Sequence, residues 1–117
     1  MSVALKNYAC GQWIPGEENQ LFHAISGEVI ATAGSEKINL GEMMQYARSV
    51  GGPALRKLTF HERGRALRSL AQHLLANKDK YYALSAATGA TKVDSWVDIE
   101  GGIGNLFSYA SLRRQFP

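Results

Sequence analysis

Several features that would fix the class of this protein are scarce or missing in its sequence. The 117 residues contain one cysteine, Cys10, which excludes an internal disulfide and any zinc site built from cysteine pairs. No stretch approaches the roughly 18 to 20 apolar residues of a membrane-spanning helix, and the first residues do not resemble a signal peptide. We therefore expect a cytoplasmic protein that has no membrane partner.

Charge of one sign is not concentrated anywhere in the chain. Thirteen basic and ten acidic residues give a net charge of +3, and they are mixed along the sequence instead of forming the basic runs that bind nucleic acid. The three histidines, His23, His61 and His73, are scattered and match no metal-ligand spacing. We expect neither a nucleic-acid partner nor a metal site. The hydrophobic content of 45% is ordinary for a globular protein with a core.

Residues 7–33 have the composition of strands separated by turns. YACGQWI, LFHAI and EVIATA read as extended segments, and PGEENQ and SG between them have turn compositions. Pro15 and Gly16 suit the central positions of a type II turn. We expect an antiparallel β-hairpin or three short strands, with Cys10 as a packing residue in the first strand. A parallel sheet would have to come from other residues.

Residues 40–116 have a period of about 3.6 and predict a helical layer of four helices. The first covers residues 40–50 and is stopped by Gly51, Gly52 and Pro53. The second begins at a capping box of Thr59 and Glu62 and runs to about residue 75. The third, capped by Asn77 or Asp79, ends near Gly89, and the fourth begins at Thr91 with Asp94 and extends to about residue 114. Strands followed by helices do not form the βαβ alternation of a complete doubly wound domain.

The predicted second helix has two distinct faces. Its apolar stripe consists of Leu67, Leu70, Ala71, Leu74 and Leu75. Its opposite face carries His61, Arg65, Arg68 and Gln72. A charged row opposite an apolar stripe is usually a solvated face. The alternative is a complete small non-enzymatic binding module that contacts an acidic partner through this row.

The stretch DSWVDIEGGIG, residues 94–104, does not match a phosphate-binding loop. Gly102 and Gly104 lead to Phe107 instead of a third glycine, and the surrounding residues have helical spacing. A glycine inside a helix costs about 0.8 to 1 kcal/mol of helix stability relative to alanine. A tertiary contact must therefore offset the cost of Gly101 and Gly104. Both border the apolar face of Trp96, and we expect another backbone or a flat ligand to approach closely there.

Glu100 lies at the edge of the same apolar face, between Trp96 and Gly104. An unpaired buried carboxylate would cost several kcal/mol or take up a proton. We therefore expect Glu100 to have a structural partner such as an arginine or backbone amides, with a ligand-facing role as the alternative. Trp96, Glu100, Gly101 and Gly104 are the structural and packing candidates of this chain.

Four segments in the same order resemble the aldehyde dehydrogenase superfamily. YACGQWIPG is similar to the opening strand and turn of the family, and ISGEVIATAG to its ATGEVIA-like segment. LTFHERGRALRSLAQHL and SAATGATKVDSWVDI resemble its next helix and its ETGKP-like stretch. The resemblance implies an α/β fold for the full-length protein. Residues 1–117 would then be the N-terminal part of a cofactor-binding domain, with strands over 7–33 and helices over 40–116.

Three segments resemble, more narrowly, the dehydrogenase half of the bifunctional ring-opening enzymes of phenylacetate degradation: GGPALRKLTFHER, YYALSAATGAT and especially DSWVDIEGGIGNLFSYASL. That resemblance implies an NADP-dependent (or NAD-dependent) oxidoreductase that converts a CoA-thioester semialdehyde to a carboxylate. It also implies a C-terminal oxepin-CoA hydrolase domain and a homo-oligomer in the full-length protein.

The catalytic cysteine and glutamate of that family lie beyond position 117, so no catalytic, cofactor-binding or metal-binding residue is assigned here. This segment alone is expected neither to bind the cofactor nor to catalyse. Its expected partner is the remainder of the dehydrogenase domain, and alone it should expose apolar helix faces and self-associate.

Overall fold

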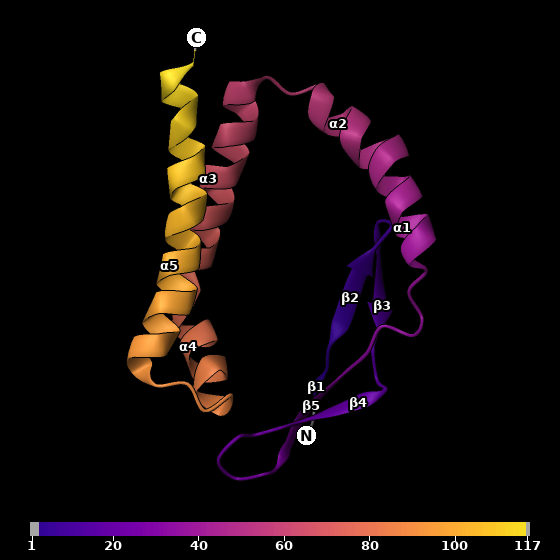
Figure 1. Cartoon of the computed structure of the whole chain (residues 1–117), viewed down its shortest axis with the longest axis vertical. Coiled ribbons are helices and arrows are strands. Elements are labelled where there is room, and N and C mark those ends of the chain that lie inside the picture. Colours follow the sequence, from indigo (N-terminus) through magenta and orange to yellow (C-terminus); the bar gives the residue numbers. More distant parts are fainter. Residues whose placement is uncertain (1–2, 117) are drawn as a thin grey trace. The chain divides into compact units, whose positions relative to one another are not determined.

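The computed structural model of the protein describes residues 3–116 and divides into two compact units, Met1–Ala54 and Leu55–Pro117 (Figure 1). Five short strands belong to the first unit: β1 (Val3–Ala4), β2 (Lys6–Ala9), β3 (Gln12–Pro15), β4 (Asn19–Phe22) and β5 (Val29–Ala33). They form a three-stranded sheet in the order β1-β5-β4 and a separate β2-β3 pair.

A tight hairpin replaces the single strand that was expected over YACGQWI. β2 and β3 pair antiparallel, with Ala9 opposite Gln12, so Cys10 and Gly11 form a two-residue turn. Their φ angles of 51° and 81° are both positive, as a type I′ turn requires. Cys10 is exposed at this turn, and the prediction that it packs inside a strand is wrong.

Gly16 has a different role from the one expected. Pro15 belongs to β3, and the φ of Gly16 is not among the positive values that a type II turn needs. A Cβ atom at Gly16 would lie 2.3 Å from the backbone oxygen of Gly34, and the Gly16 N–H donates to the Leu5 oxygen at 3.0 Å. Glycine is needed here because two backbone segments approach each other closely.

One strand pair is parallel, contrary to expectation. β1 pairs with β5 in parallel, with Val3 opposite Ala31, whereas β4 and β5 are antiparallel. The sequence offered no signal for a two-residue strand, whose pairing depends on a distant segment. Ala9 and Ala31 are buried side chains of this unit.

The helical segment after the strands does not stop where expected. α1 (Leu40–Tyr46) continues through a π-helical segment (Ala47–Gly51) into α2 (Gly52–Arg56). The Gly52 N–H donates to the Ala47 oxygen five residues back. A proline inside an α-helix lacks a donor and clashes with the carbonyl four residues earlier, and a local π-bulge relieves that conflict. Pro53 therefore sits within a helical path instead of ending it.

Three helices make up most of the second unit: α3 (Phe60–Ala76), α4 (Lys78–Ala87) and α5 (Lys92–Ser111), followed by a 3₁₀ turn (Leu112–Gln115). Both predicted capping boxes are confirmed, at Thr59 with Glu62 and at Thr91 with Asp94. Asn77 precedes α4, but its side chain donates to the His73 oxygen instead of capping that helix. Gly89 has a positive φ of 86°.

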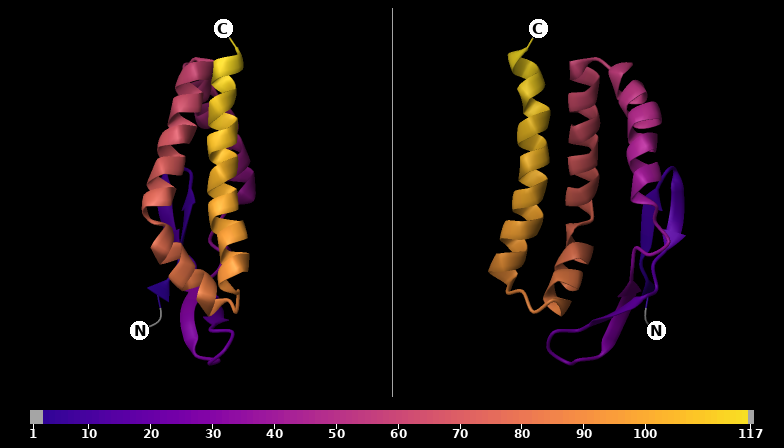
Figure 2. Two further views of the ribbon diagram at one scale, coloured as in Figure 1. Left: turned by 90° about the vertical axis from the view of Figure 1, so that its left-hand side faces the viewer. Right: turned by 45° about the vertical axis from the view of Figure 1, so that its right-hand side comes forward.

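The core of the second unit lies between α3 and α5, which run side by side and make the most extensive contact (Figures 1 and 2). Ala71, Ile103 and Ala110 are its buried apolar residues. A Cβ atom at Gly64 would lie 3.3 Å from the Ala110 oxygen, so this glycine lets the two helices approach. Among residues 3–116, no helix is long and apolar enough to cross a membrane.

Candidate functional site

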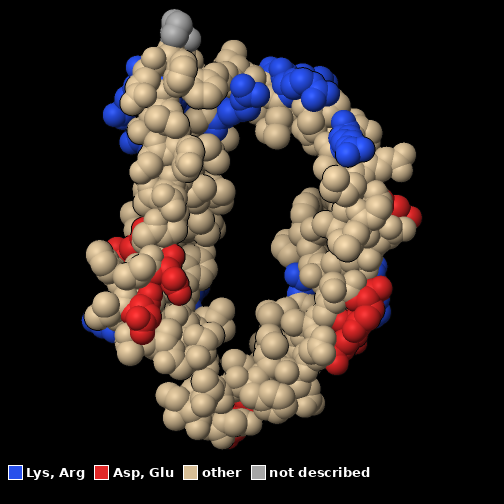
Figure 3. All heavy atoms as spheres, viewed as in Figure 1, with Lys and Arg blue, Asp and Glu red and all other residues tan. Residues whose placement is uncertain are grey.

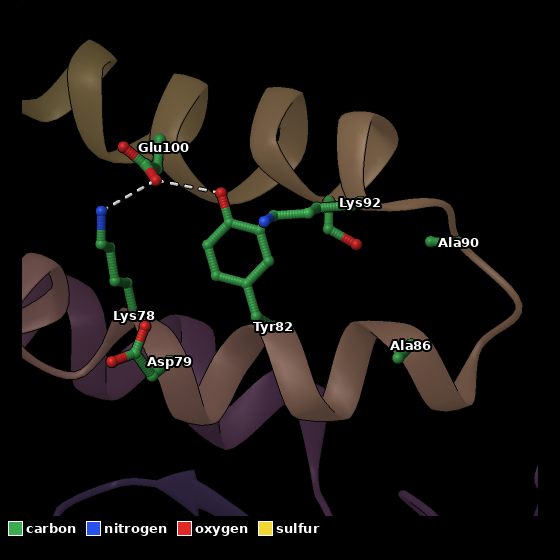
Figure 4. A pocket seen from close by; sticks show the side chains of 8 residues that line it. Lys78, Asp79, Tyr82, Ala86, Ala90, Lys92 and Glu100 are labelled. Carbon is green, nitrogen blue, oxygen red and sulfur yellow. Dashed lines mark hydrogen bonds and ion pairs between the residues drawn. The ribbon is translucent and has the colours of Figure 1, made fainter.

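A groove of about 470 Å³ separates α4 from α5 and contains Glu100 (Figure 4). Polar, charged and small apolar side chains line it together: Lys78, Asp79, Tyr82, Ala86, Ala90, Lys92, Ser95 and Glu100. Lys78 and Tyr82 are four residues apart on α4 and so lie on one face of that helix. They point across the groove toward Glu100 on α5.

Glu100 has two partners on α4. Lys78 Nζ lies 3.0 Å from Glu100 Oε1, and the Tyr82 hydroxyl donates to the same oxygen at 2.9 Å. The Lys78 and Glu100 side chains are 38% and 28% exposed, so solvent reaches the pair but does not surround it. We call Lys78, Tyr82 and Glu100 the α4–α5 clamp. A lysine and a phenol thus take the place of the arginine or backbone amides that were expected.

The clamp shifts the titration of all three groups. The Lys78 hydrogen bond, together with the Tyr82 hydrogen bond, lowers the pKa of Glu100 below its usual 4.5. The hydrogen bond to Glu100 and its negative charge raise the pKa of Lys78 above 10.5. Desolvation, followed by the hydrogen bond to Glu100, raises the pKa of Tyr82 above 10.0. At neutral pH Glu100 and Lys78 are therefore charged and Tyr82 keeps its proton as a donor.

A second polar contact joins the same helices closer to their connection. Ser85 Oγ on α4 and Ser95 Oγ on α5 are 2.8 Å apart. Ser95 is only 2% exposed, so this bond satisfies a hydroxyl that water does not reach. The clamp and the serine pair together hold α4 against the first three turns of α5.

The contacts across the groove are those that join two helices: an ion pair, a phenol–carboxylate hydrogen bond and a serine pair. The one cysteine of the chain, Cys10, lies in the other unit, at the exposed hairpin turn. No group of acidic, histidine or cysteine side chains suited to a metal ion occurs among residues 3–116. Oε1 of Glu100 accepts from both Lys78 and Tyr82, and the lowered pKa of this carboxylate makes it a weaker proton acceptor.

Trp96 and Gly101 are exposed, and no described residue closely approaches Gly101 or Gly104. Trp96 is 57% exposed, and nothing lies within 4 Å of a Cβ built at Gly101, Gly102 or Gly104. At about 100° per residue, Gly101 faces away from buried Ile103 and is exposed, whereas Gly104 lies about a quarter turn from Ile103 and is half-buried. The expected close approach to these glycines is not made within residues 3–116 and stays a prediction.

Two further grooves gather residues that the sequence did not connect. Arg68 of α3 lines a groove of about 240 Å³ with Phe107, Arg113 and Arg114 near the end of α5. In Figure 3, Lys and Arg surfaces lie around that end of the second unit, and Asp and Glu surfaces lie near the N-terminal half of α5. The helical wheel of residues 59–75 alone could not reveal this, because two of the arginines follow α5.

The other groove, of about 460 Å³, lies where α3, α4 and α5 meet. It is lined by Leu74, Tyr81, Ile99, Gly102, Ile103 and Leu106. Leucine spacing on α3 predicted part of this surface, but the contribution of Tyr81 from α4 requires the three-helix arrangement.

Comparison with known proteins adds an independent observation. Over 111 residues the chain is 37% identical to the 3,4-dehydroadipyl-CoA semialdehyde dehydrogenase of Aromatoleum evansii. The chain is thus related in sequence to a semialdehyde dehydrogenase. The alignment covers 92% of this chain and 22% of that dehydrogenase. No family model matches the chain.

Proposed function

We propose that this chain is the N-terminal structural segment of a cytoplasmic aldehyde dehydrogenase of α/β fold that oxidises a CoA-thioester semialdehyde. The observation that carries the proposal is the 37% identity to a semialdehyde dehydrogenase over 92% of the chain. The α4–α5 clamp supports a structural role, because its polar groups satisfy one another within the chain. The proposal includes no catalytic residue in these 117 positions.

The finer parts of the proposal rest on the narrower resemblance of three segments, above all residues 94–112. By that resemblance the full-length enzyme uses NADP, acts in aerobic phenylacetate catabolism, forms a homo-oligomer and carries a C-terminal oxepin-CoA hydrolase domain. The cofactor would be held by the remainder of the dehydrogenase domain. The 117 residues would support that domain without contacting the reacting atoms.

Expression of the intact gene tests the proposal. The purified product should reduce NADP when given a CoA-thioester semialdehyde, whereas the 117-residue chain should reduce none. NAD in place of NADP, and a free semialdehyde in place of the thioester, are the controls for cofactor and substrate. An intact gene product that reduces neither cofactor with any semialdehyde would contradict the proposal.

The groove lined by Arg68, Arg113 and Arg114 favours a second candidate, a binding module for an acidic partner. Three guanidinium groups around one groove give a stronger field than the scattered charges of α3 alone. Polyglutamate is a suitable probe. Binding of the 117-residue chain that weakens with salt and is lost in Arg68→Gln, but not in the control Arg48→Gln, would support this candidate.

A further inference from the structure

Three arginines line one groove near the C-terminal end of α5. Arg68 comes from α3, whereas Arg113 and Arg114 follow α5, so two segments far apart in the sequence supply the charges. No acidic side chain lines this groove, and the one ion pair among residues 3–116 lies elsewhere, in the α4–α5 clamp. Lys and Arg surfaces gather around this end of the second unit (Figure 3). The three guanidinium groups repel one another, and an anion between them would relieve that repulsion.

One of these guanidinium groups is held in place by the helices. Arg113 donates from Nη1 to the Ala110 oxygen, and its stem lies over Gly64, where a Cβ atom would be 3.0 Å from Arg113 Cδ. Ala110 is buried and Phe107 is half-buried, so part of the groove wall is apolar. A fixed cation beside an apolar wall binds an anion more strongly than a mobile cation in open water, because less side-chain entropy is lost and the field is less screened.

The size and charge of the groove fit a phosphate group. Its volume is about 240 Å³, below the roughly 300 to 1,000 Å³ of sites that enclose a whole drug-sized ligand, so it suits one terminal group of a larger molecule. A phosphomonoester carries about −1.5 to −2 charge at neutral pH and three acceptor oxygens, whereas a carboxylate carries a single charge. The planar fork of arginine also matches phosphate with two parallel hydrogen bonds. The groove is therefore better matched by a phosphomonoester than by one carboxylate.

We infer that the groove lined by Arg68, Arg113 and Arg114 binds the ribose phosphomonoester of the CoA-thioester substrate. This inference rests on the proposed function, which supplies a substrate of that class. CoA carries this phosphate on its adenosine, at the opposite end from the thioester, so a segment without catalytic residues can hold it there. NADP carries the same group on the 2′ instead of the 3′ oxygen of its ribose, and the position of the phosphate therefore distinguishes the two sources.

Nucleotide binding to the intact gene product tests this site. Calorimetric titration with adenosine 3′,5′-bisphosphate, the phosphorylated end of CoA, should show binding that Arg68→Gln and Arg114→Gln each weaken by about tenfold, as expected for the loss of a charge-assisted hydrogen bond. Both side chains are exposed, so neither substitution opens the core. Arg68→Lys should lose less affinity, because it keeps the charge. Arg48→Gln, at an exposed position of the first unit, removes the same charge and should leave the affinity unchanged.

Two further titrations identify the source of the phosphate. Arg68→Gln should leave unchanged the affinity for adenosine 2′,5′-bisphosphate, the phosphorylated end of NADP, and any affinity for polyglutamate. If the substitution instead weakens binding of the 2′,5′ nucleotide alone, the groove serves the cofactor and the inference is wrong. If it weakens binding of polyglutamate alone, the groove serves an acidic partner and the inference is equally wrong.

Kinetics separate this inference from the proposed function. In an active dehydrogenase, Arg68→Gln should raise KM for the CoA thioester several-fold, with kcat and the rate with a free semialdehyde unchanged. Unchanged KM and unchanged nucleotide affinity in both arginine variants of an active dehydrogenase would overturn the site and leave the proposed function intact. A gene product that binds the 3′,5′ nucleotide through these arginines but oxidises no semialdehyde would support the site and contradict the proposed function.

Discussion

The two units of the chain, which meet between Ala54 and Leu55, are stabilised by different kinds of contact. In the first unit, Gly16 and Gly34 bring two backbone segments together, and the main buried side chains are two alanines. In the second unit, two capping boxes fix the starts of α3 and α5, and Ile103, the α4–α5 clamp and the serine pair join the helices. The first unit depends on backbone geometry, and the second depends on side chains.

The largest expected effect comes from the side-chain core of the second unit. Ile103→Ala should destabilise that unit by about 3 kcal/mol, because it removes a nearly buried side chain and leaves a cavity. Hydrogen exchange should show faster exchange in α3 and α5 but unchanged exchange in β4 and β5. Val97→Ala, at a 56% exposed position of α5, is the control and should change stability by less than about 0.5 kcal/mol. Equal loss of protection in both units would break the comparison.

A substitution that disturbs the backbone of the first unit should instead speed hydrogen exchange in that unit and leave the second unit unchanged. Gly16→Ala places a methyl group against the Gly34 carbonyl and should destabilise the first unit by about 2 kcal/mol. Amide exchange should accelerate at Gly16 and in β1 and β5, with α3 and α5 unaffected. Gly51→Ala is the control, because a Cβ there meets nothing within 4 Å, and it should leave exchange in the strands unchanged. If the strands of Gly16→Ala exchange their amide hydrogens as slowly as those of the wild type, the close approach of Gly16 and Gly34 does not stabilise the first unit.

The smallest expected effect is electrostatic and tests whether the α4–α5 clamp stabilises the second unit. Glu100→Gln should lower the melting temperature slightly at neutral pH, because it removes the charge that Lys78 and Tyr82 face. The pKa of Glu100 is lowered by folding, so this stabilisation is present above 4.5 and is lost as the pH falls through the folded value. The pKa of Lys78 is raised, so its share is lost as the pH rises above 10.5.

Melting curves of the wild type and Glu100→Gln across pH provide the measurement. The gap between them should be steady near neutral pH and close in acid. Asp98→Asn removes a charge from an exposed position of the same helix and is the matched control. An equal melting temperature for wild type and Glu100→Gln at pH 7 would contradict a stabilising clamp.

The features that the sequence predicted correctly depend on residues close together in the chain. Thr59 with Glu62 and Thr91 with Asp94 were predictable because each capping box closes within three residues. The partners of Glu100 were not, because Lys78 is 22 residues away and reaches it only after α4 folds back on α5. Gly16 was misread for the same reason: its constraint comes from Gly34, not from Pro15 beside it. The close approach predicted at Gly101 and Gly104 likewise depends on tertiary contacts, which helical spacing alone does not identify.

The exposed thiol at the β2–β3 turn has a practical consequence for anyone handling this protein. Cys10 is the sole sulfhydryl of the sequence and lies at the surface. Storage in air will join chains turn to turn through a covalent bridge, which doubles the mass on a non-reducing gel without any native interface. Measurements of molecular size therefore need a reductant, and the same thiol offers a single attachment point for a fluorophore.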